Sequence, residues 1–281
     1  MMKWKIVVDS SANIRKLPDT SAAIDLEVVP FYLQIDDETI VDNSEIDFAD
    51  LFAKFKTADK CTTACPSPAT FAESFAGADN VLCFTITGGL SGCYNSAVNG
   101  RTMALEDNPE QNIFVFDSRS TGPEMDMLVE KAVEFIDAYD DFDEVVDALK
   151  AYHQHTRLVF ILQSIDNLVT NGRVSSVAAS IVGLLNLRLI GRRTDEGTIE
   201  LAHRVRGNAR VIKKTIAQME EEGYVGGRIV LAEHLNPSMA EDFKKAVQAK
   251  YPNAEITIRP GTGLTAFYAE DGGLIVGYER Q

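Results

Sequence analysis

Three short apolar runs in this chain each end in a cluster of small hydroxyl-bearing residues. Residues 5–8, KIVV, lead into DSS; residues 81–84, VLCF, lead into TITGGLSG; and residues 113–116, IFVF, lead into DSRST. Runs of this length and composition predict buried strands. Helical patterns lie between them, and strands that alternate with helices predict a mostly parallel sheet. The carboxyl ends of such strands meet at one crevice, where ligands bind.

The crevice predicted at these strand ends is rich in hydroxyl and backbone N–H groups and poor in acids and bases. A fourth cluster, TTACPSP at residues 62–68, opens a helix, with Ser67 and Pro68 at its N-cap and N1 positions. Groups that donate hydrogen bonds without titrating suit the binding of an anion better than the cleavage of a bond. We therefore expect an anion-binding crevice.

The order of the predicted elements changes near residue 156. Before that point strands alternate with helices, whereas later segments mix helices with hairpins. Strand pairs are predicted over residues 187–193 and 198–205, and over residues 264–268 and 274–278. We expect an N-terminal α/β domain at residues 1–156, with a mostly parallel doubly wound sheet, and a C-terminal α+β domain at residues 157–281. A chain of 281 residues accommodates two domains of ordinary size.

Charge is distributed unevenly along the chain. The net charge is −15, which argues against binding of nucleic acid or of an acidic membrane by the surface as a whole. Residues 157–214 carry a charge of +6, however, so the remainder carries −21. This asymmetry indicates either a basic face for an acidic or phosphate-bearing partner, or charge that is simply solvated on a hairpin and a helix. The sequence leaves both interpretations open.

Several protein classes find no support in the sequence. No segment reaches the ~20 apolar residues needed to span a bilayer, and no early run has the pattern of a signal peptide. The four cysteines are too few for a disulfide scaffold, and no histidine or second cysteine pair completes a metal site around Cys61 and Cys65. Phosphate-binding and dinucleotide-binding glycine motifs are missing. We expect a cytoplasmic protein with reduced thiols, no metal and no cofactor.

Ser91 lies where a predicted strand passes into a helix, within the run GGLSG at residues 88–92. Its hydroxyl and the first N–H groups of the helix point toward a ligand at this place, and the glycines let the backbone approach it. Ser91 is equally consistent with a plain N-cap, worth ~1 kcal/mol to the helix. Residues 89–93 also nearly match the G-x-S-x-G elbow of hydrolases, with Cys93 in place of the last glycine and His234 as the candidate base.

These segments, taken in order, resemble the motifs of the DegV family of bacterial fatty-acid-binding proteins. IVVDSSA at residues 6–12 resembles the family's opening strand and turn, TACPSP at 63–68 its T-S-x-P-S-P motif, and GLSGCYNSA at 89–97 its G-L-S-G-T-Y-x-S-A motif. NGRV at 171–174 resembles G-G-R-I, and LNLRLI at 185–190 resembles L-N-I-K-P-I. The resemblance covers essentially the whole chain, and its motifs are specific in combination.

The resemblance implies a DegV-like fold that binds one long-chain fatty acid between two domains. It implies a lipid carrier with no catalytic residues, which presents the carboxylate to an ATP-using fatty acid kinase for phosphorylation in lipid synthesis. The hydroxyls of Thr63 and Ser91 and the backbone N–H near Gly92 would bind the carboxylate. Arg173 and Arg206 would lie at the mouth of the site or on the surface that faces the kinase.

The acyl chain requires an apolar tunnel, and we expect Phe71, Val177, Ile181 and Leu184 in its wall, although an ordinary core is the competing interpretation. One motif departs from the family pattern: the closing H-x-G-P-G is matched to AEDGG at residues 269–273, which puts Ala269 at the histidine position. A carrier of another small anion, and a serine hydrolase or acyltransferase that uses Ser91, therefore remain as alternatives.

Overall fold

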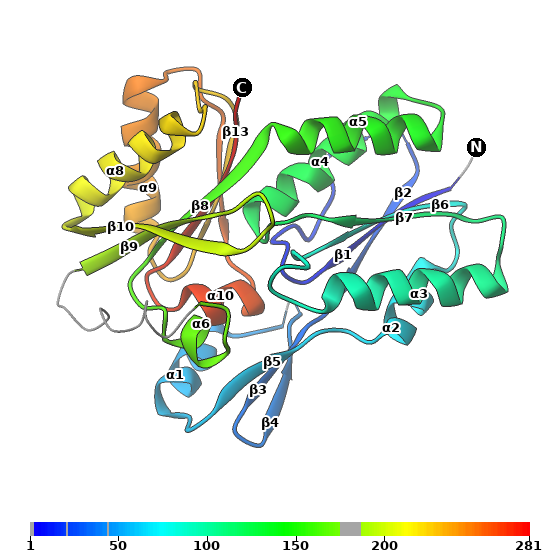
Figure 1. Cartoon of the computed structure of the whole chain (residues 1–281), viewed down its shortest axis with the longest axis horizontal. Helices are drawn as coiled ribbons and strands as arrows, with labels where there is room; N and C mark the ends of the chain where they lie inside the picture. The colour runs from blue at the N-terminus through cyan, green and yellow to red at the C-terminus, as the bar shows by residue number, and fades with distance from the viewer. Residues whose placement is uncertain (1–2, 21, 44, 175–186) are drawn as a thin grey trace.

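The computed structural model describes residues 3–20, 22–43, 45–174 and 187–281 of the chain (Figure 1). Within these ranges the chain forms a parallel sheet, a larger mixed sheet and a small antiparallel sheet. In Figure 1 the parallel sheet with its helices lies to the right, the mixed sheet to the left and the small sheet below.

The parallel sheet has the strand order β2-β1-β6-β7. Its strands are β1 (Trp4–Asp9), β2 (Ile24–Val29), β6 (Asn80–Thr85) and β7 (Asn112–Asp117). Helices α2 (Pro68–Phe75) and α3 (Cys93–Asp107) cover one face, and α4 (Pro123–Ala138) and α5 (Phe142–Gln154) cover the other. Successive side chains of each strand point to opposite faces of the sheet, so each strand contributes to both cores. Val7 packs on the α2 side and Ile6 on the α4 side. The predicted doubly wound α/β arrangement is confirmed.

The mixed sheet has the strand order β10-β9-β8-β13-β11-β12. Its strands are β8 (Thr156–Leu162), β9 (Leu187–Arg193), β10 (Ile199–Arg206), β11 (Ile229–Glu233), β12 (Ile256–Pro260) and β13 (Leu274–Glu279). Helices α8 (Asn208–Glu221) and α9 (Pro237–Lys250) cover one face. The opposite face carries a smaller apolar cluster that includes Leu158, Phe160 and Ile275. The predicted hairpin over β9 and β10 is confirmed.

The small sheet was not predicted as a separate unit. It pairs β3 (Tyr32–Ile35) with β4 (Glu38–Val41) and with β5 (Cys61–Ala64), all antiparallel, and α1 (Phe48–Thr57) follows β4 in the chain. Residues 28–35 read as one apolar segment in the sequence, but Pro30 separates β2 from β3. Proline lacks the N–H that a continuous strand would need there, so the chain leaves the parallel sheet at this residue.

Residues 264–268, predicted as a strand, form a helix instead. Helix α10 (Gly263–Ala269) begins with a capping box in which the side chains of Thr262 and Thr265 each accept a hydrogen bond from the other's backbone N–H. The usual capping box has Glu or Gln three residues after the N-cap, whereas this chain has Thr265 there, so the sequence gives little sign of the helix start. Leu264 and Phe267 pack into the core of the N-terminal half. These two residues belong to the predicted C-terminal domain but pack on the predicted N-terminal one. The division into residues 1–156 and 157–281 stays a prediction.

Helix α4 joins the two large sheets. It packs on the parallel sheet through one side and contacts β8, β11 and β13 of the mixed sheet through another. The approach is close, since a Cβ atom on Gly277 of β13 would lie 2.6 Å from the backbone nitrogen of Glu124. The short helix α6 (Asp166–Thr170) packs against α10 on the far side of the mixed sheet. These contacts leave a space between the strand ends of the parallel sheet and the uncovered face of the mixed sheet.

Candidate functional site

A cavity lies between the strand ends of the parallel sheet and the uncovered face of the mixed sheet. Its volume is about 840 Å³, including the part open to solvent. The mixed sheet contributes apolar side chains to its wall, among them Leu158, Phe160 and Leu162 of β8 and Ile275 of β13. The strand ends of the parallel sheet contribute polar side chains, among them Thr87, Ser91, Ser120 and Thr121. The cavity is therefore apolar on one side and rich in hydroxyl groups on the other.

Ser91 lines the cavity on its polar side. The residue at the N-cap of α3 is Gly92, and the hydroxyl oxygen of Ser91 accepts the N–H of Cys93 at 3.2 Å. Because that oxygen acts as an acceptor for the helix, the hydroxyl proton of Ser91 is left to donate elsewhere. The interpretation of Ser91 as the N-cap is wrong, because Gly92 holds that position. The interpretation of Ser91 as a ligand-binding residue stays a prediction, and its hydroxyl proton is available for that role.

Thr63 lines the cavity from β5. Its hydroxyl oxygen lies 2.9 Å from the hydroxyl oxygen of Tyr268 on α10, and either group can be the donor. Tyr268 also lines the cavity and was not predicted as a site residue. No motif marks this tyrosine in the sequence, because its partner is 205 residues away and meets it only when β5 and α10 pack together.

Arg173 brings a positive charge to the same region. Its Nε donates to the carbonyl oxygen of Leu90 at 3.1 Å, next to Ser91, and its Nη1 donates to the carbonyl of Asn171. The amide of Asn171 in turn donates to the carbonyl of Cys61 on β5 at 3.3 Å. These contacts tie the segment after α6 both to the Ser91 loop and to the strand that carries Thr63. In the described part of the chain Arg173 has no carboxylate partner, so its charge is available to an anion.

Arg193 also lines the cavity but is neutralised by an acid. Its Nη2 and Nε lie 2.6 and 2.7 Å from the two carboxylate oxygens of Glu124, and both side chains are buried. Burial on its own would raise the pKa of Glu124, but the charge and hydrogen bonds of Arg193 outweigh it and lower that pKa. Arg193 is therefore held in a bidentate ion pair. Arg173, which has no such partner among the described residues, is a candidate for binding a ligand anion.

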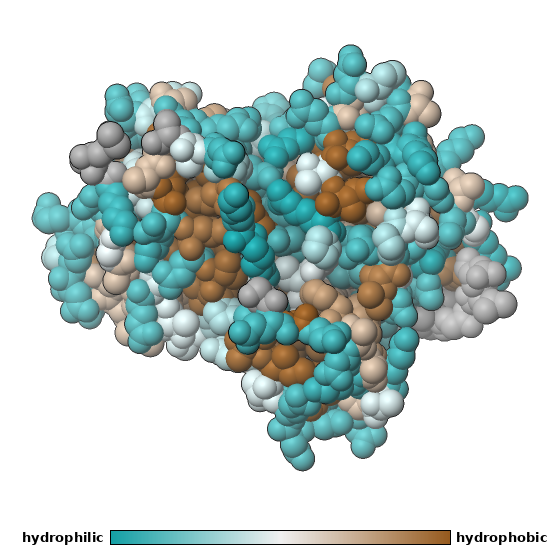
Figure 2. All heavy atoms as spheres, turned by 180° about the vertical axis from the view of Figure 1, so that it is seen from behind, coloured by the Kyte–Doolittle hydropathy of each residue, from teal (hydrophilic) through white to brown (hydrophobic). Residues whose placement is uncertain are grey.

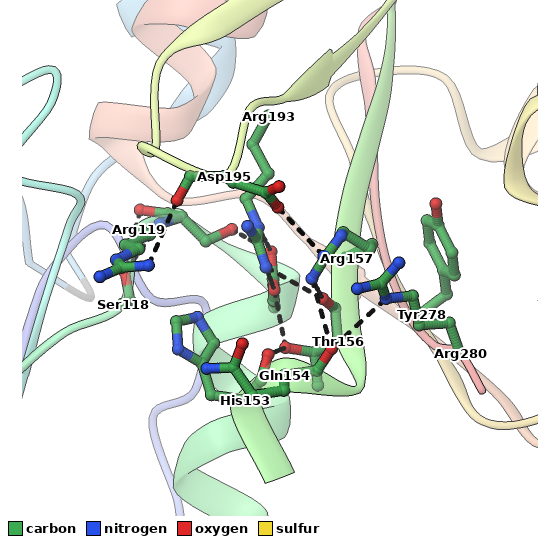
Figure 3. A network of polar contacts seen from close by, with 12 residues as sticks. Ser118, Arg119, His153, Gln154, Thr156, Arg157, Arg193, Asp195, Tyr278 and Arg280 are labelled. Carbon is green, nitrogen blue, oxygen red and sulfur yellow. Dashed lines mark hydrogen bonds and ion pairs between the residues drawn. The ribbon is translucent and has the colours of Figure 1, made fainter. Parts of the chain in front are cut away.

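The tip of the β9–β10 hairpin closes one side of the cavity. The hydroxyl of Thr87 donates to the carbonyl of Gly197 at 2.9 Å, and Arg119 donates to the carbonyl of Asp195 at 3.4 Å. Figure 3 shows this contact beside the ion pair of Arg157 with the Asp195 carboxylate, which is 3.1 Å long. Gly197 has a φ of +78°, and a Cβ atom there would lie 2.1 Å from the Thr87 hydroxyl. Only glycine fits at this position.

Two buried carboxylates hold the surrounding loops in place. Asp9 accepts the backbone N–H groups of Ser11 at 2.9 Å and Ile86 at 2.6 Å, and Asp42 accepts those of Gly263 and Leu264 at 2.9 Å. Burial raises the pKa of both aspartates, although these hydrogen bonds act in the opposite direction. Neither residue lines the cavity. Their position indicates a structural role in setting the strand-end loop and the start of α10.

The histidine that the hydrolase interpretation needs is engaged elsewhere. His234 is buried, with its Nδ1 3.2 Å from the Gly273 carbonyl and its Nε2 3.1 Å from the Thr265 hydroxyl. Burial lowers the pKa of His234 to about 4. Among the described residues that line the cavity there is no histidine. The described residues also contain no group of three His, Cys, Asp or Glu placed to hold a metal ion.

The other predicted site residues lie in different environments. Gly92 adjoins the cavity wall at Ser91, and Arg206 is exposed at the end of β10, away from the cavity lining. Phe71 is fully buried in the core between α2 and the parallel sheet and not in the cavity wall. Ala269 does line the cavity. Val177, Ile181 and Leu184 lie outside the described residues.

The apolar side of the cavity was missed by sequence reasoning. Residues 158–162, LVFIL, read as a buried strand, and β8 confirms that. Val159 and Ile161 face the helical core, whereas Leu158, Phe160 and Leu162 face the cavity. Both faces are equally apolar in the sequence, so the pattern does not distinguish a core from a ligand-binding wall.

The fold and the cavity define an α/β protein with a mainly apolar space between its large sheets. A family model described as the DegV family of uncharacterised proteins matches residues 3–280. A DegV domain-containing protein of Streptococcus pyogenes serotype M3 is 42% identical over 279 residues, which span 99% of this chain and 100% of that protein. The chain therefore belongs to the DegV family, as its motifs predicted.

Solved structures of relatives agree with the fold in detail. The Fatty Acid Kinase (Fak) B3 protein of Streptococcus pneumoniae, loaded with linoleic acid, matches with a TM-score of 0.97 and 40% identity over 100% of both chains. A DegV family protein from Eubacterium eligens, loaded with heptadecanoic acid, matches with a TM-score of 0.95 and 32% identity over 99% of this chain and 100% of that one. Both relatives were crystallised with a long-chain fatty acid.

Proposed function

We propose that this protein binds one long-chain fatty acid in the cavity and presents its carboxylate to a fatty acid kinase. The two-sided wall of the cavity carries this proposal, since it matches a molecule with a long apolar chain and one anionic end. The similarity to relatives loaded with linoleic and heptadecanoic acid supports the same ligand class. The protein acts as a carrier, because the site offers hydrogen-bond donors and a cation, while the described residues that line the cavity place no histidine beside Ser91.

The apolar wall supplies most of the binding free energy. Burial of about 14 methylenes is worth ~11 kcal/mol before the losses of association, at ~0.8 kcal/mol each. A hydrogen bond to the charged head group adds ~1–3 kcal/mol. The side chains of Thr63, Ser91 and Arg173, with the backbone near Gly92, therefore orient the carboxylate more than they hold the ligand. Phosphorylation of that carboxylate by the kinase yields an acyl phosphate for lipid synthesis.

We propose that Arg206 belongs to the surface that faces the kinase. It is exposed at the end of the edge strand β10, and the nearby side chains of Arg204, Arg210 and Lys213 are exposed too. A basic surface on a chain with a net charge of −15 favours docking of an acidic partner. We place the protein in the cytoplasm, where ATP is available and its free cysteines stay reduced. No helix in the described ranges is long and apolar enough to cross a membrane.

Native mass spectrometry of gently purified protein tests the ligand assignment. We expect a bound mass in the long-chain fatty acid range, and we expect delipidated protein to take up fatty acid in a one-to-one ratio. Ser91→Ala should weaken fatty acid binding by about fivefold, since it removes one head-group hydrogen bond, and lower kinase turnover further. Thr102→Ala on the exposed side of α3 is the matched control.

Two outcomes would contradict the proposal. Protein that is recovered empty and takes up no fatty acid is not a fatty acid carrier, and covalent labelling of Ser91 by a fluorophosphonate would indicate a hydrolase. Arg206→Glu separates binding from presentation. It should leave fatty acid affinity unchanged and raise the KM of the kinase for the loaded carrier, with the difference shrinking at high salt.

A further inference from the structure

Helix α10 brings two hydroxyl-bearing side chains to the cavity, Thr265 and Tyr268, and no motif predicted either. The Thr265 hydroxyl is engaged with His234 and with the backbone N–H of Thr262, so Tyr268 is the residue to consider. The hydroxyl oxygens of Tyr268 and Thr63 are 2.9 Å apart, and both residues line the cavity. The next residue, Ala269, also lines it but has no polar side-chain atom. The last turn of α10 therefore makes its polar contribution to the cavity through Tyr268.

The number of hydroxyl protons determines how many hydrogen bonds Thr63 and Tyr268 can donate. Each hydroxyl carries one proton, and the bond between the two groups uses one of them. Whichever group donates, one proton of the pair remains and can point to a ligand. The hydroxyl of Ser91 likewise retains its proton, because its oxygen already accepts the N–H of Cys93. Together with the charge of Arg173, the site offers donors and positive charge, which matches a carboxylate.

The position of Tyr268 is held from both ends of α10. At the start of the helix, Asp42 accepts the N–H groups of Gly263 and Leu264 at 2.9 Å. Near its end, the side chain of Asn167 on α6 donates to the carbonyl of Phe267 at 2.8 Å. The ring of Tyr268 packs edge-on against that of Phe267, with centroids 4.7 Å apart. A phenol held in this way costs little further ordering when a ligand binds.

We propose that Tyr268 is a positioning residue of the head-group site. Its hydroxyl fixes the hydroxyl of Thr63, so that the pair presents a single preset donor and the site prefers an ionised fatty acid to an uncharged lipid of the same length. The inference rests on the proposed function, since it specifies which chemical form of the ligand the site selects.

Tyr268→Phe tests the inference, because it keeps the ring and removes the hydroxyl. Binding of a fatty acid and of the fatty alcohol of equal chain length is measured by calorimetry on delipidated full-length protein. We expect acid affinity to fall about fivefold to tenfold and alcohol affinity to stay nearly constant, so that the acid-to-alcohol ratio falls. Tyr251→Phe is the matched control, since its hydroxyl bonds Glu220 away from the cavity.

A double-mutant cycle with Thr63→Val identifies the pair itself. If Tyr268 acts through Thr63, the two substitutions together should cost clearly less acid affinity than the product of their separate effects. Independent effects would contradict positioning. In a kinase assay, Tyr268→Phe should raise the KM for the loaded carrier less than it lowers kcat, because a misplaced carboxylate still arrives at the kinase.

A fall in acid and alcohol affinity by the same factor would overturn the inference, because loosened packing affects both ligands alike. Fluorotyrosine at position 268 covers the case in which the phenylalanine variant fails to fold. It retains the shape and strengthens the donor, so it should change the acid-to-alcohol ratio, and an unchanged ratio would overturn the inference. If the unaltered protein binds no fatty acid, the proposed function fails instead, so the two failures are distinguishable.

Discussion

One glycine is paired with one aromatic residue at the cavity wall. Gly191 on β9 lies directly opposite Phe160 on β8, whose ring covers the glycine and forms part of the cavity wall. A Cβ atom on Gly191 would lie 2.3 Å from the ring of Phe160 and 2.7 Å from the backbone oxygen of Glu200. The absence of a side chain at residue 191 therefore leaves room for the ring over this residue.

Gly191→Ala should push the Phe160 ring into the cavity. We expect a loss of about 1–3 kcal/mol in the free energy of unfolding, because the new methyl group overpacks the strand pair. Affinity should fall more for long acyl chains than for short ones, and binding across a series of chain lengths measures this. The added change Phe160→Leu should restore long-chain binding. An equal loss at every chain length would argue against a role of this pair in cavity width.

Helix α4 connects the two large sheets through the ion pairs of three buried acids. Glu124 pairs with Arg193 of β9, Asp126 pairs with Arg259 of β12 at 2.8 Å, and Glu130 pairs with Arg259 and with Arg228. The three acids belong to one helix, whereas their partners come from separate parts of the mixed sheet. Such pairs fix one relative placement of the sheets, because an alternative placement would leave charges buried without partners.

Removal of one partner of the Glu124–Arg193 pair should be costly. Arg193→Leu leaves the carboxylate buried without its cation, and we expect a loss of about 3–5 kcal/mol in urea unfolding experiments. Arg192→Leu, on the same strand, removes a half-exposed arginine whose ion pairs involve Glu200 and Glu222, so it should cost far less. Similar losses for both variants would contradict the assignment of the buried pair as the main connection.

The pH dependence of stability follows from the same pair. Because the folded state lowers the pKa of Glu124, the carboxylate contributes stability above its unfolded pKa, and this contribution disappears as the pH falls through the lower folded value. Glu124→Gln removes the contribution, so the stability of the variant should fall less steeply as the pH drops below 4.5, the ordinary pKa of a glutamate. Unfolding curves across that range measure the difference from the unaltered protein, and parallel curves would contradict it.

At the scale of the whole molecule, the two faces of the mixed sheet are covered differently. One face packs on α8 and α9, and the other borders the cavity and α10. The outer surface seen from behind is largely hydrophilic, with hydrophobic residues gathered in separate areas (Figure 2). Leu158, Phe160, Leu162 and Ile275 are buried even though the cavity lies against them. A fatty acid in the cavity would therefore complete the apolar layer on this face of the sheet.

Removal of the ligand should lower the thermal stability. A ligand present at about 100 times its Kd stabilises the folded state by ~2.7 kcal/mol, and in a protein of this size ~1 kcal/mol corresponds to roughly 2–4 °C in Tm. We therefore expect delipidation to lower the Tm by several degrees, and added fatty acid to restore it. Calorimetry measures both, and a fatty alcohol should restore less. An unchanged Tm would mean that the apolar face is stable without its ligand.

The sequence by itself determined the features that depend on local order along the chain. Strand runs such as residues 81–84, the Ser67-Pro68 helix start and the β9–β10 hairpin follow from periodicity and turn chemistry, and the combination of motifs identified the family. Local reasoning pointed to Ser91, and the resemblance to the family added Thr63 and Arg173; all three line the cavity. Segments with weak local signals were misread, as α10 was, because a threonine capping box resembles an ordinary loop.

Only the tertiary structure decided which of these residues meet. The contacting pairs come from elements that are distant in the chain or that have similar apolar patterns. They are Thr63 with Tyr268, Glu124 with Arg193, and Phe160 with Gly191. The apolar wall belongs to the same class of feature, because β8 is apolar on both faces and only the placement of helices determines which face remains for a ligand. Periodicity reports that a side chain will be buried, whereas the packing of whole elements determines what it is buried against.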